Sequence, residues 1–450
     1  MSVSAIRNLA RNLPARLHAI AEEKLQRYSD REFRQEAKYH LQLMQKVKLP
    51  DEEDTLDLKK AEIKTELEIR GKLEPGYDPE KLQLAEESWA KRDQLSEIIQ
   101  GMLEERRRDW HYYEYDERAA LMYMATRLAP NYASLKTVMS EIRTLDPDFK
   151  PRSVLDFGSG MGTTIWAINE TWPKEVTEFM NVDISKEQQN LCEYLLRGGK
   201  DFGEPLQGVF HRQYLPSSNR VRYDMVVVAF SLLELPNRQL RAQTIENLWQ
   251  KTNDLLVIVE RGNKGGFSTV NEARNFVLDL SGYDVTKKVN LTSETRPITR
   301  LDPLEAHVLA PCPHEFVCPR ALMPSKKRMD ICRFSVPYVP LEIGEKRLPT
   351  MREEFSYVVV RKQPHPNQVS ENYNFRWPRI VESPQRRGKH VRHKLCCPDG
   401  TLTECVVAKG RYDKEAYEIA KDRRWGEILP IRIKNDVGTK NSRLLKSGSG

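Results

Sequence analysis

Five of the seven cysteines fall in two separate stretches of the chain. Cys312, Cys318 and Cys332 lie in the first stretch, and the adjacent Cys396 and Cys397 lie in the second. Thiolates select zinc ions or iron–sulfur clusters. Five and thirteen residues separate the first three cysteines, whereas zinc sites commonly use pairs separated by about two to four residues. This irregular spacing favours a 4Fe-4S cluster, with zinc as the alternative. Buried free cysteines without a metal are the structural alternative.

The adjacent Cys396 and Cys397 can supply one ligand between them. Successive side chains of a β-strand point to opposite faces, so only one of the two sulfurs can face the other thiols. We assign this role to Cys396. Cys405 and Cys192 are expected in the core, and His314 is either a zinc ligand or a hydrogen-bonding group. A centre built this way joins two remote stretches, so metal binding would contribute to folding.

A glycine-rich segment, Asp156-Phe-Gly-Ser-Gly-Met-Gly162, could bind a nucleotide-like cofactor. Gly158, Gly160 and Gly162 lie between a predicted strand and a predicted helix, where the absence of side chains lets a ligand approach the backbone. Asp183 ends the next predicted strand 21 residues after Gly162, where an acid can accept hydrogen bonds from ribose hydroxyls. A glycine turn without a ligand is the structural alternative.

The spacing Asp-x-Gly-x-Gly-x-Gly resembles the class I S-adenosylmethionine-dependent methyltransferases more than the dinucleotide pattern. By that resemblance, Asp156 lies near the methionine amino group of S-adenosyl-L-methionine and Asp183 on its ribose. Phe230 and Ser231, at the end of the fourth predicted strand, complete the cofactor-binding set. The segment Ala229 to Pro236 contains neither the Asn/Asp-Pro-Pro-aromatic turn of base methylation nor a cysteine nucleophile.

Glu234 could act as a base in this segment, although a capping or surface role is more common for a single carboxylate. The catalytic residues therefore stay unknown. A domain that binds the cofactor but transfers no methyl group is one interpretation, and an active methyltransferase is the other.

Short apolar runs alternate with helical segments from Arg152 onward, which is the pattern of a parallel sheet with crossover helices. The predicted fold class is α/β, a class I S-adenosylmethionine methyltransferase-like (Rossmann-like) seven-stranded sheet with an N-terminal helical region and a small basic C-terminal β-containing domain. The predicted strands are 153–156, 179–183, 209–214, 223–230, 255–260, 306–310 and 355–360. The predicted helices are 163–170, 185–196, 239–251 and 268–280. A turn at Pro398-Asp-Gly400 predicts a hairpin of residues 391–397 and 401–408.

A chain of 450 residues exceeds the usual limit of about 250 to 300 residues for one core, so several domains are expected. Residues 1–21 are basic, free of acids and apolar at helical spacing, which predicts a mitochondrial targeting segment, with an ordinary helix as the alternative. Charged helical sequence predicts an N-terminal helical region over 22–145. The predicted methyltransferase-like domain spans 146–362, with a cysteine-bearing insertion at 311–350. The role of the N-terminal helices stays open.

The positive charge of the chain is concentrated near its C-terminus. The net charge is +7, and residues 361–450 contain 20 lysines and arginines against 10 acids. A localised basic surface is typical of nucleic-acid binding, so residues 363–450 form the predicted basic RNA-binding domain. A solvated basic tail is the alternative. Trp377 and Trp425 could stack on bases or pack in the core. The candidate phosphate contacts are Arg386, Arg387, Lys389, Arg392 and Lys394.

Several motifs together resemble the methyltransferase-like protein 17 family of mitochondrial ribosomal small-subunit assembly factors. They are the glycine segment at 156–162, Ala229-Phe-Ser-Leu-Leu-Glu-Leu-Pro, Ala310-Pro-Cys-Pro-His-Glu, Trp377-Pro-Arg-Ile and Leu395-Cys-Cys-Pro-Asp-Gly. The resemblance covers roughly residues 110 to 430. It implies a protein of the mitochondrial matrix that binds small-subunit rRNA during maturation, alongside other assembly factors, and is needed for mitochondrial translation.

The resemblance also implies a 4Fe-4S cluster on Cys312, Cys318, Cys332 and Cys396, and a methyltransferase fold with weak or lost methyl transfer. The alternative function is an active S-adenosylmethionine-dependent methyltransferase of rRNA or of a ribosomal protein. The sequence contains no run of about 18 apolar residues, so no membrane span is expected.

Overall fold

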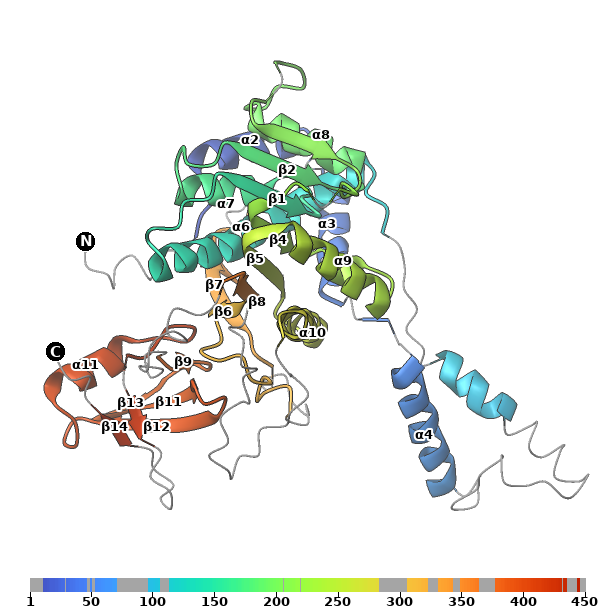
Figure 1. Ribbon diagram of the computed structural model, residues 1–450. Helices are drawn as coiled ribbons and strands as arrows, with labels where there is room; N and C mark the ends of the chain where they lie inside the picture. Colours follow the sequence, from blue (N-terminus) through green and yellow to red (C-terminus); the bar gives the residue numbers. More distant parts are fainter. Residues whose placement is uncertain are drawn as a thin grey trace, which may run out of the picture. The chain divides into compact units, whose positions relative to one another are not determined.

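A sheet of eight strands, in the order β3-β2-β1-β4-β5-β8-β6 with β7 also paired to β8, lies at the centre of the larger of two units (Figure 1). The first five strands of the chain run parallel, and β8 is antiparallel to β5, β6 and β7. The strands are β1 (Ser153–Phe157), β2 (Glu178–Val182), β3 (Val209–Arg212), β4 (Tyr223–Ala229), β5 (Thr252–Arg261), β6 (His307–Ala310), β7 (Phe334–Tyr338) and β8 (Met351–Arg361). This parallel sheet with a reversed strand inserted near one end confirms the predicted class I methyltransferase-like fold.

The computed structural model describes residues 11–28, 30–46, 49–50, 53–70, 96–105, 113–204, 206–218, 220–282, 306–322, 331–342, 349–363, 377–430, 432–434 and 443–445. The chain divides into two units. The larger comprises residues 1–47, 114–234 and 242–450, and the smaller comprises residues 48–113 and 235–241. The sequence Pro75-Gly76, which should interrupt the N-terminal helices because proline and glycine are poor helix formers, lies outside the described residues.

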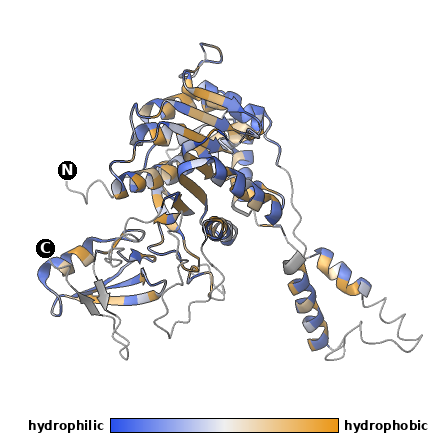
Figure 2. Ribbon diagram, in the orientation of Figure 1, coloured by the Kyte–Doolittle hydropathy of each residue, from blue (hydrophilic) through white to orange (hydrophobic). Residues whose placement is uncertain are grey.

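The central strands are apolar because both faces of the sheet are covered by helices. Val226, Val227 and Val228 of β4 are fully buried, as are Leu255 to Val259 of β5, and Figure 2 shows the apolar colour concentrated on these strands. The crossover and covering helices are α6 (Glu117–Leu145), α7 (Thr163–Thr171), α8 (Lys186–Leu196), α9 (Arg238–Lys251) and α10 (Lys264–Leu280). Side-chain caps at Asp116, Ser185 and Asn263 begin three of them.

Strand β7 was not expected from the sequence. It follows Cys332 directly and pairs only with β8, from Phe334 opposite Phe355 to Tyr338 opposite Met351. Pro337 discourages a strand assignment because proline cannot donate a ladder hydrogen bond. The pairing leaves one side of β7 free of ladder partners in the described sheet, and an edge position of this kind tolerates proline.

Helix α2 (Ala15–Gln26) packs into the main core. Leu17, Ala21 and Leu25 are fully buried, and Leu13 and Ile20 are 6% and 7% exposed. The boundary at residue 21 that we predicted for a removable targeting segment falls inside this helix. Cleavage there would take buried side chains out of the core. The ordinary-helix alternative describes residues 15–21, while a targeting role stays a prediction. Helix α3 (Arg31–Lys46) follows and packs on α6.

Residues 377–430 form a small C-terminal subdomain with a core of its own. Its strands are β9 (Arg379–Ile380), β10 (Gln385–Arg387), β11 (His390–Cys396) and β12 (Leu402–Ala408), and its helix is α11 (Lys414–Asp422). The hairpin of β11 and β12 was predicted, and Gly400 makes its turn with φ +79°. Beyond the subdomain, β13 (Arg432–Lys434) pairs with β14 (Arg443–Leu445).

The smaller unit contains helix α4 (Glu53–Ile69) and a helical stretch at 96–105. Ile63, Leu67 and Leu103 form its small apolar cluster. Within the described part of the chain, no helix is both long and apolar enough to span a membrane.

Candidate cofactor pocket and thiol centre

The glycine segment turns sharply between β1 and α7. Gly158, Gly160 and Gly162 have φ values of +66°, +50° and +76°, a region that side chains with a Cβ rarely adopt. A Cβ on Gly158 would lie 2.0 Å from the Ser231 Oγ, and one on Gly162 would lie 2.4 Å from the Cys192 Sγ. The first and third glycines are therefore required by packing as well as by conformation, and Cys192 is buried behind the loop as expected.

Asp183 holds the glycine loop from the end of β2. Its Oδ2 accepts a hydrogen bond from the Gly160 N–H at 2.7 Å, and its Oδ1 accepts one from the Ser185 N–H at 2.9 Å. Burial raises the pKa of Asp183, and these two backbone donors oppose the rise. The acid predicted to bind ribose thus lies at the loop, with its carboxylate turned toward the middle glycine.

Asp156 is the penultimate residue of β1, just before the glycine loop, and is 1% exposed. Burial raises its pKa to about 7, a hydrogen bond from Thr164 opposes the rise, and the negative charge of Asp183 adds to it. A cation placed against this carboxylate would favour its charged form.

Several buried polar atoms around the loop have no hydrogen-bond partner among the described residues. They are the Asp156 Oδ2, the Ser159 Oγ, both amide atoms of Asn181 and the Gln188 Oε1. Asn181 pairs with Asp156 across β1 and β2, and the Gln188 Oε1 lies 3.8 Å from a Cβ built on Gly160. Buried polar groups are nearly always satisfied, so these atoms fit a polar ligand with amino and hydroxyl groups, as S-adenosylmethionine has.

The end of β4 closes the other side of the pocket. Phe230 has a positive φ of 61° and its N–H donates to the Val259 O at 2.8 Å. Ser231 donates through its Oγ to the carbonyls of Ala229 and Gly158 at 3.0 and 3.3 Å. A phenylalanine held in the left-handed region stores strain of a kind that concentrates at functional sites. The structure therefore brings Phe230 and Ser231 to the same loop as the three glycines.

Two carboxylates, those of Glu234 and Glu260, belong to or contact the segment that follows Ser231. Glu234 is exposed at the surface, yet neighbouring residues desolvate its carboxyl group and raise its pKa to about 7, an effect that the charge of Arg261 opposes. Its Oε1 accepts a hydrogen bond from the Tyr115 hydroxyl at 3.1 Å. Glu260, at the end of β5, accepts from the Leu232 and Leu233 N–H groups at 2.8 and 3.3 Å. Sequence reasoning missed Tyr115 and Glu260, because no motif connects them to the segment that they hold.

The thiols of Cys312, Cys318, Cys332 and Cys396 share one neighbourhood. Burial raises the pKa of Cys396, and Cys312, Cys318 and Cys332 each raise it further. The charges of Cys318 and Cys312 likewise raise the pKa of Cys332. Sulfurs from the stretch after β6 and from the end of β11 therefore lie close enough to repel one another as thiolates. As they stand in the described residues, no three His, Cys, Asp or Glu side chains converge to form a ready metal site.

Cys397 points away from this neighbourhood, as the alternation of β11 requires. It belongs to the core of the C-terminal subdomain together with Cys405, which is fully buried. His314, 1% exposed, lies with its Nε2 3.3 Å from the Cys396 Sγ, which matches the hydrogen-bonding role that we considered for it.

Three buried arginines act on the thiols through their charge, and no spacing in the sequence indicates them. Arg274 of α10 is 2% exposed and donates to the carbonyls of His314 and Phe316 at 2.8 and 2.9 Å. Its hydrogen-bond partners among the described residues are neutral, and its positive charge lowers the pKa of Cys318. A buried cation without a carboxylate partner is costly unless another anion lies near it. Thiolates at Cys312 and Cys318 would supply that anion.

The positive charges of Arg320 and Arg379 lower the pKa of Cys332, against the larger effect of burial. Arg320 forms an ion pair with Glu382 at 2.6 Å. Arg379 donates to the Pro311 O at 2.9 Å and to the Gly426 O at 2.8 Å, and it pairs with Glu141 of α6. The charge environment thus fits a centre that carries net negative charge, such as a cluster bound by four thiolates.

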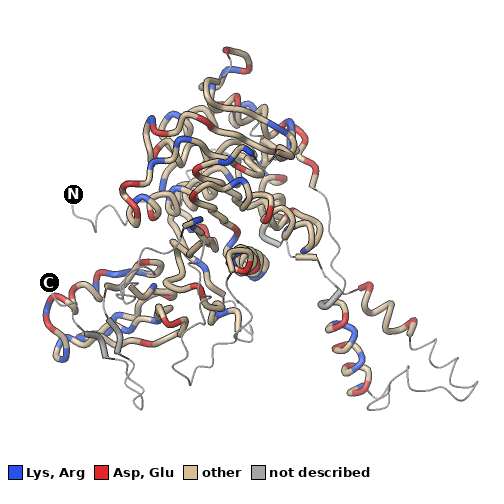
Figure 3. The backbone as a smooth tube through the Cα atoms, viewed as in Figure 1, with Lys and Arg blue, Asp and Glu red and all other residues tan. Residues whose placement is uncertain are grey.

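The five predicted RNA contacts divide into two groups. Arg387, Lys389 and Arg392 are exposed, and Arg392 has only a loose 3.9 Å pair with Glu404. Arg386 donates to the Lys421 and Arg423 carbonyls at the end of α11, and Lys394 pairs with Glu382 at 3.1 Å. Figure 3 shows lysines and arginines along the hairpin strands and around α11, interspersed with acids. Trp377 and Trp425 are both partly exposed.

Comparison with known proteins places the chain among mitochondrial ribosome proteins. Residues 117–430 match the family described as Mitochondrial small ribosomal subunit Rsm22. The chain is 38% identical over 323 residues to the human Ribosome assembly protein METTL17, mitochondrial, covering 72% of this chain and 65% of the relative. It is 22% identical over 430 residues to the Saccharomyces cerevisiae Ribosome assembly protein RSM22, mitochondrial, covering 70% of this chain and 67% of the relative.

Two Schizosaccharomyces pombe relatives, the Rsm22-cox11 tandem proteins, are 28% identical, and the chain spans 45% of their length. Among solved structures, a magnesium protoporphyrin IX methyltransferase from Synechocystis aligns over 52% of this chain and 83% of its own, with a TM-score of 0.28 and 10% identity. A putative RNA methyltransferase from Pyrococcus horikoshii aligns over the same shares with a TM-score of 0.26 and 12% identity. The fold assignment rests on the strand order and not on these alignments.

Proposed function

The chain belongs to the Rsm22 family, and from this we propose that it is an assembly factor of the mitochondrial small ribosomal subunit that binds rRNA in the mitochondrial matrix. Its partners are the maturing subunit, its rRNA and other assembly factors, and mitochondrial translation depends on it. The observation that carries the proposal is that the family match spans both the methyltransferase-like sheet and the C-terminal subdomain, at residues 117–430.

A 4Fe-4S cluster is the centre that the thiols support best in this proposal. Cys312, Cys318 and Cys332 would hold it from one side and Cys396 from the other, and zinc is the alternative metal. When bound, the cluster supplies a covalent link between the stretch after β6 and the hairpin. Arg274, Arg320 and Arg379 would offset its negative charge in the protein interior.

S-adenosylmethionine is the ligand proposed for the glycine pocket. Asp156 would accept from its ammonium group and Asp183 from its ribose hydroxyls, while Gly158, Gly160 and Gly162 leave room for it and Phe230 and Ser231 bound the pocket. The absence of an acceptor-binding turn in the segment at 229–236 supports weak or lost methyl transfer.

An active methyltransferase of rRNA or of a ribosomal protein is the second candidate function. Glu234 favours it, because an accessible carboxylate with a pKa of about 7 beside the pocket could take a proton from an acceptor. Isotope-labelled S-adenosylmethionine, incubated with immature small subunits beside a binding measurement, separates the two. The proposal expects binding without transfer, and transfer that disappears in Gly160→Val would establish the alternative.

The link between cluster and ribosome is tested with the double variant Cys312→Ser/Cys318→Ser. We expect it to lose iron after anaerobic purification and to stop sedimenting with small subunits from mitochondria. Cys405→Ala, which alters a buried thiol outside the centre, is the matched control and should keep both properties. Normal association of the double variant without iron would reject the coupling, and zinc in place of iron would identify the metal.

A further inference from the structure

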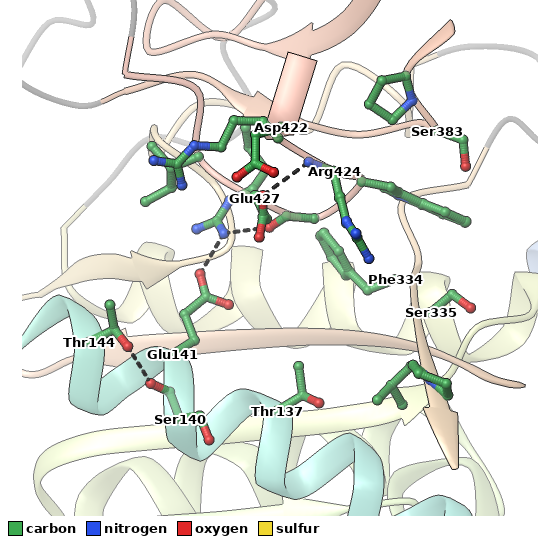
Figure 4. A pocket seen from close by; sticks show the side chains of 18 of the residues that line it. Thr137, Ser140, Glu141, Thr144, Phe334, Ser335, Ser383, Asp422, Arg424 and Glu427 are labelled. Carbon is green, nitrogen blue, oxygen red and sulfur yellow. Dashed lines mark hydrogen bonds and ion pairs between the residues drawn. The ribbon is translucent and has the colours of Figure 1, made fainter. Parts of the chain in front are cut away.

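A cleft of about 1310 Å³ separates helix α6 and strands β7 and β8 from the C-terminal subdomain, all within the larger unit. Figure 4 shows Thr137, Ser140 and Glu141 of α6 along one wall, Asp422, Arg424 and Glu427 facing them, and Phe334 and Ser335 of β7 beside them. The methyltransferase-type pocket does not share these residues. None of the functions discussed above uses this cleft as a whole.

The cleft carries guanidinium charge that carboxylates do not neutralise. Among the described residues, Arg11, Arg352 and Arg423 line the cleft and form no ion pair. Arg352 is exposed, and its guanidinium donates to the Ser335 Oγ and O at 2.9 and 3.2 Å. Arg386 is exposed as well and donates only to carbonyls. These cations are available to a ligand with repeated negative charge.

The acids of the cleft are mostly engaged by neighbours. Glu141 pairs with Arg379, Glu418 lies 3.7 Å from Lys421, and Glu427 accepts from the Arg424 N–H at 3.0 Å. Their charges therefore oppose an anionic ligand less than their number suggests.

An indole ring and several hydroxyl groups complete the lining. Trp425 is partly exposed, and its Nε1 has no hydrogen-bond partner among the described residues. An unpaired buried donor costs free energy unless a ligand satisfies it. The Ser383 hydroxyl lies on the lining, where it can donate to a phosphate or sugar oxygen. Thr137 and Ser140 donate their hydroxyls to the Ala133 and Lys136 carbonyls of α6 at 2.7 and 2.6 Å, so their oxygens can only accept from a ligand.

The size and chemistry of the cleft select a polymer over a small molecule. Pockets for small ligands have volumes of about 300 to 1,000 Å³, whereas this cleft is larger and several arginines line it. Cations that track a backbone, combined with an aromatic ring on which a base can stack, are the features of single-strand nucleic-acid binding.

We propose that this cleft binds single-stranded RNA, with Arg352, Arg423 and Arg386 contacting phosphates and Trp425 stacking on one base. The inference rests on the proposed rRNA-binding function and gives it a second surface, distinct from the exposed residues Arg387, Lys389 and Arg392 of the hairpin. Arg379 forms part of the cleft wall and also bonds to the Pro311 O beside the thiols. Arg379 therefore links the wall of the cleft to the stretch that carries the thiols.

The test measures binding of a fluorescein-labelled twelve-nucleotide oligouridine to the full-length chain by anisotropy, at several potassium chloride concentrations. For Arg352→Glu/Arg423→Glu we expect binding at least tenfold weaker. The slope of log K against log salt should fall by about 1.4, since each lost single-strand phosphate contact contributes about 0.7. Trp425→Leu should weaken binding roughly tenfold, and Trp425→Phe should restore most of it because the ring is retained.

Lys200→Glu/Arg220→Glu is the matched control, because it makes the same charge change at two exposed residues outside the cleft. It should bind nearly as well as the unaltered chain. If the cleft variants bind no worse than this control while Lys389→Glu/Arg392→Glu binds weakly, the cleft inference is wrong and the proposed rRNA binding stands. If the unaltered chain binds no oligouridine, the proposed rRNA binding fails first. Equal binding of a duplex of the same length would overturn the single-strand assignment.

Discussion

Asp156 is the residue that makes the cofactor proposal most directly testable. It is 1% exposed, one of its oxygens has no partner among the described residues, and burial raises its pKa to about 7. A carboxyl group in this state holds a proton below pH 7 and releases it when a cation arrives.

We expect the affinity for S-adenosylmethionine to rise with pH up to about 7 and then to level. Below the raised pKa, the ligand ammonium must displace a proton from Asp156, which costs up to about tenfold in affinity for each pH unit. Calorimetric titrations between pH 5.5 and 8.5 measure this profile. Asp156→Asn should bind weakly at every pH with a flat profile, and the exposed Glu204→Gln should keep the normal one. An unaltered profile in Asp156→Asn would refute the role.

At the scale of residues, the sequence can indicate which side chains lie together where one local pattern contains the whole signal. Gly158, Gly162 and Asp183 lie within 26 residues of one another, and the structure brings them together. Arg274, Arg320 and Arg379 lie far apart in the chain and gather only after folding, so no spacing could indicate them. Cys396 was separated from Cys397 by strand alternation alone, which is a local property.

At the scale of elements, the buried parallel strands are the part of this chain that the sequence predicts best. β4 and β5 appear in the sequence as continuous apolar runs because helices cover both faces of the sheet. β7 escaped prediction because Pro337 and an edge position weaken the strand pattern. For helix α2 the sequence left two interpretations open for another reason. A basic amphipathic helix has the same pattern whether it directs import or packs on a core, and only tertiary contacts distinguish the two.

Helix α2 should contribute measurably to stability. Leu17 is fully buried in the main core, so Leu17→Ala is expected to lower the free energy of unfolding by about 2 to 5 kcal/mol. Urea unfolding followed by circular dichroism measures this change. Leu58→Ala, at a leucine of α4 that is 67% exposed, is the control and should shift it by less than about 0.5 kcal/mol. Equal effects of the two substitutions would mean that α2 does not pack as described.

At the scale of the whole molecule, the thiol centre lies where the larger unit joins two separately folded cores. The main core contains the sheet, and the C-terminal subdomain has its own core of Ile380, Leu395, Cys405 and their neighbours. Cys396 is the single proposed ligand from the subdomain. A cluster bound there would restrain the subdomain against the sheet.

Cys396→Ser and Cys397→Ser test this restraint with adjacent positions. We expect Cys396→Ser to lose the visible absorption of the cluster and to raise the hydrogen-exchange rates of amides in β9 and β11. Cys397→Ser changes a thiol of the subdomain core and should keep the absorption and the slow exchange near the centre. Loss of absorption in Cys397→Ser with full retention in Cys396→Ser would reverse the ligand assignment.

The contacts of Arg379 also set an order for biosynthesis. Its guanidinium bonds to the Pro311 O, the Gly426 O and the Glu141 carboxylate. The segments around Glu141 and Pro311 therefore gain this contact only after Arg379 has been synthesised. Until Arg379 and Gly426 have left the ribosome, Glu141 lacks its cation and the stretch around Pro311 lacks its anchor. A nascent chain that stops short of this point would leave Glu141 of α6 without the cation that it pairs with in the complete fold.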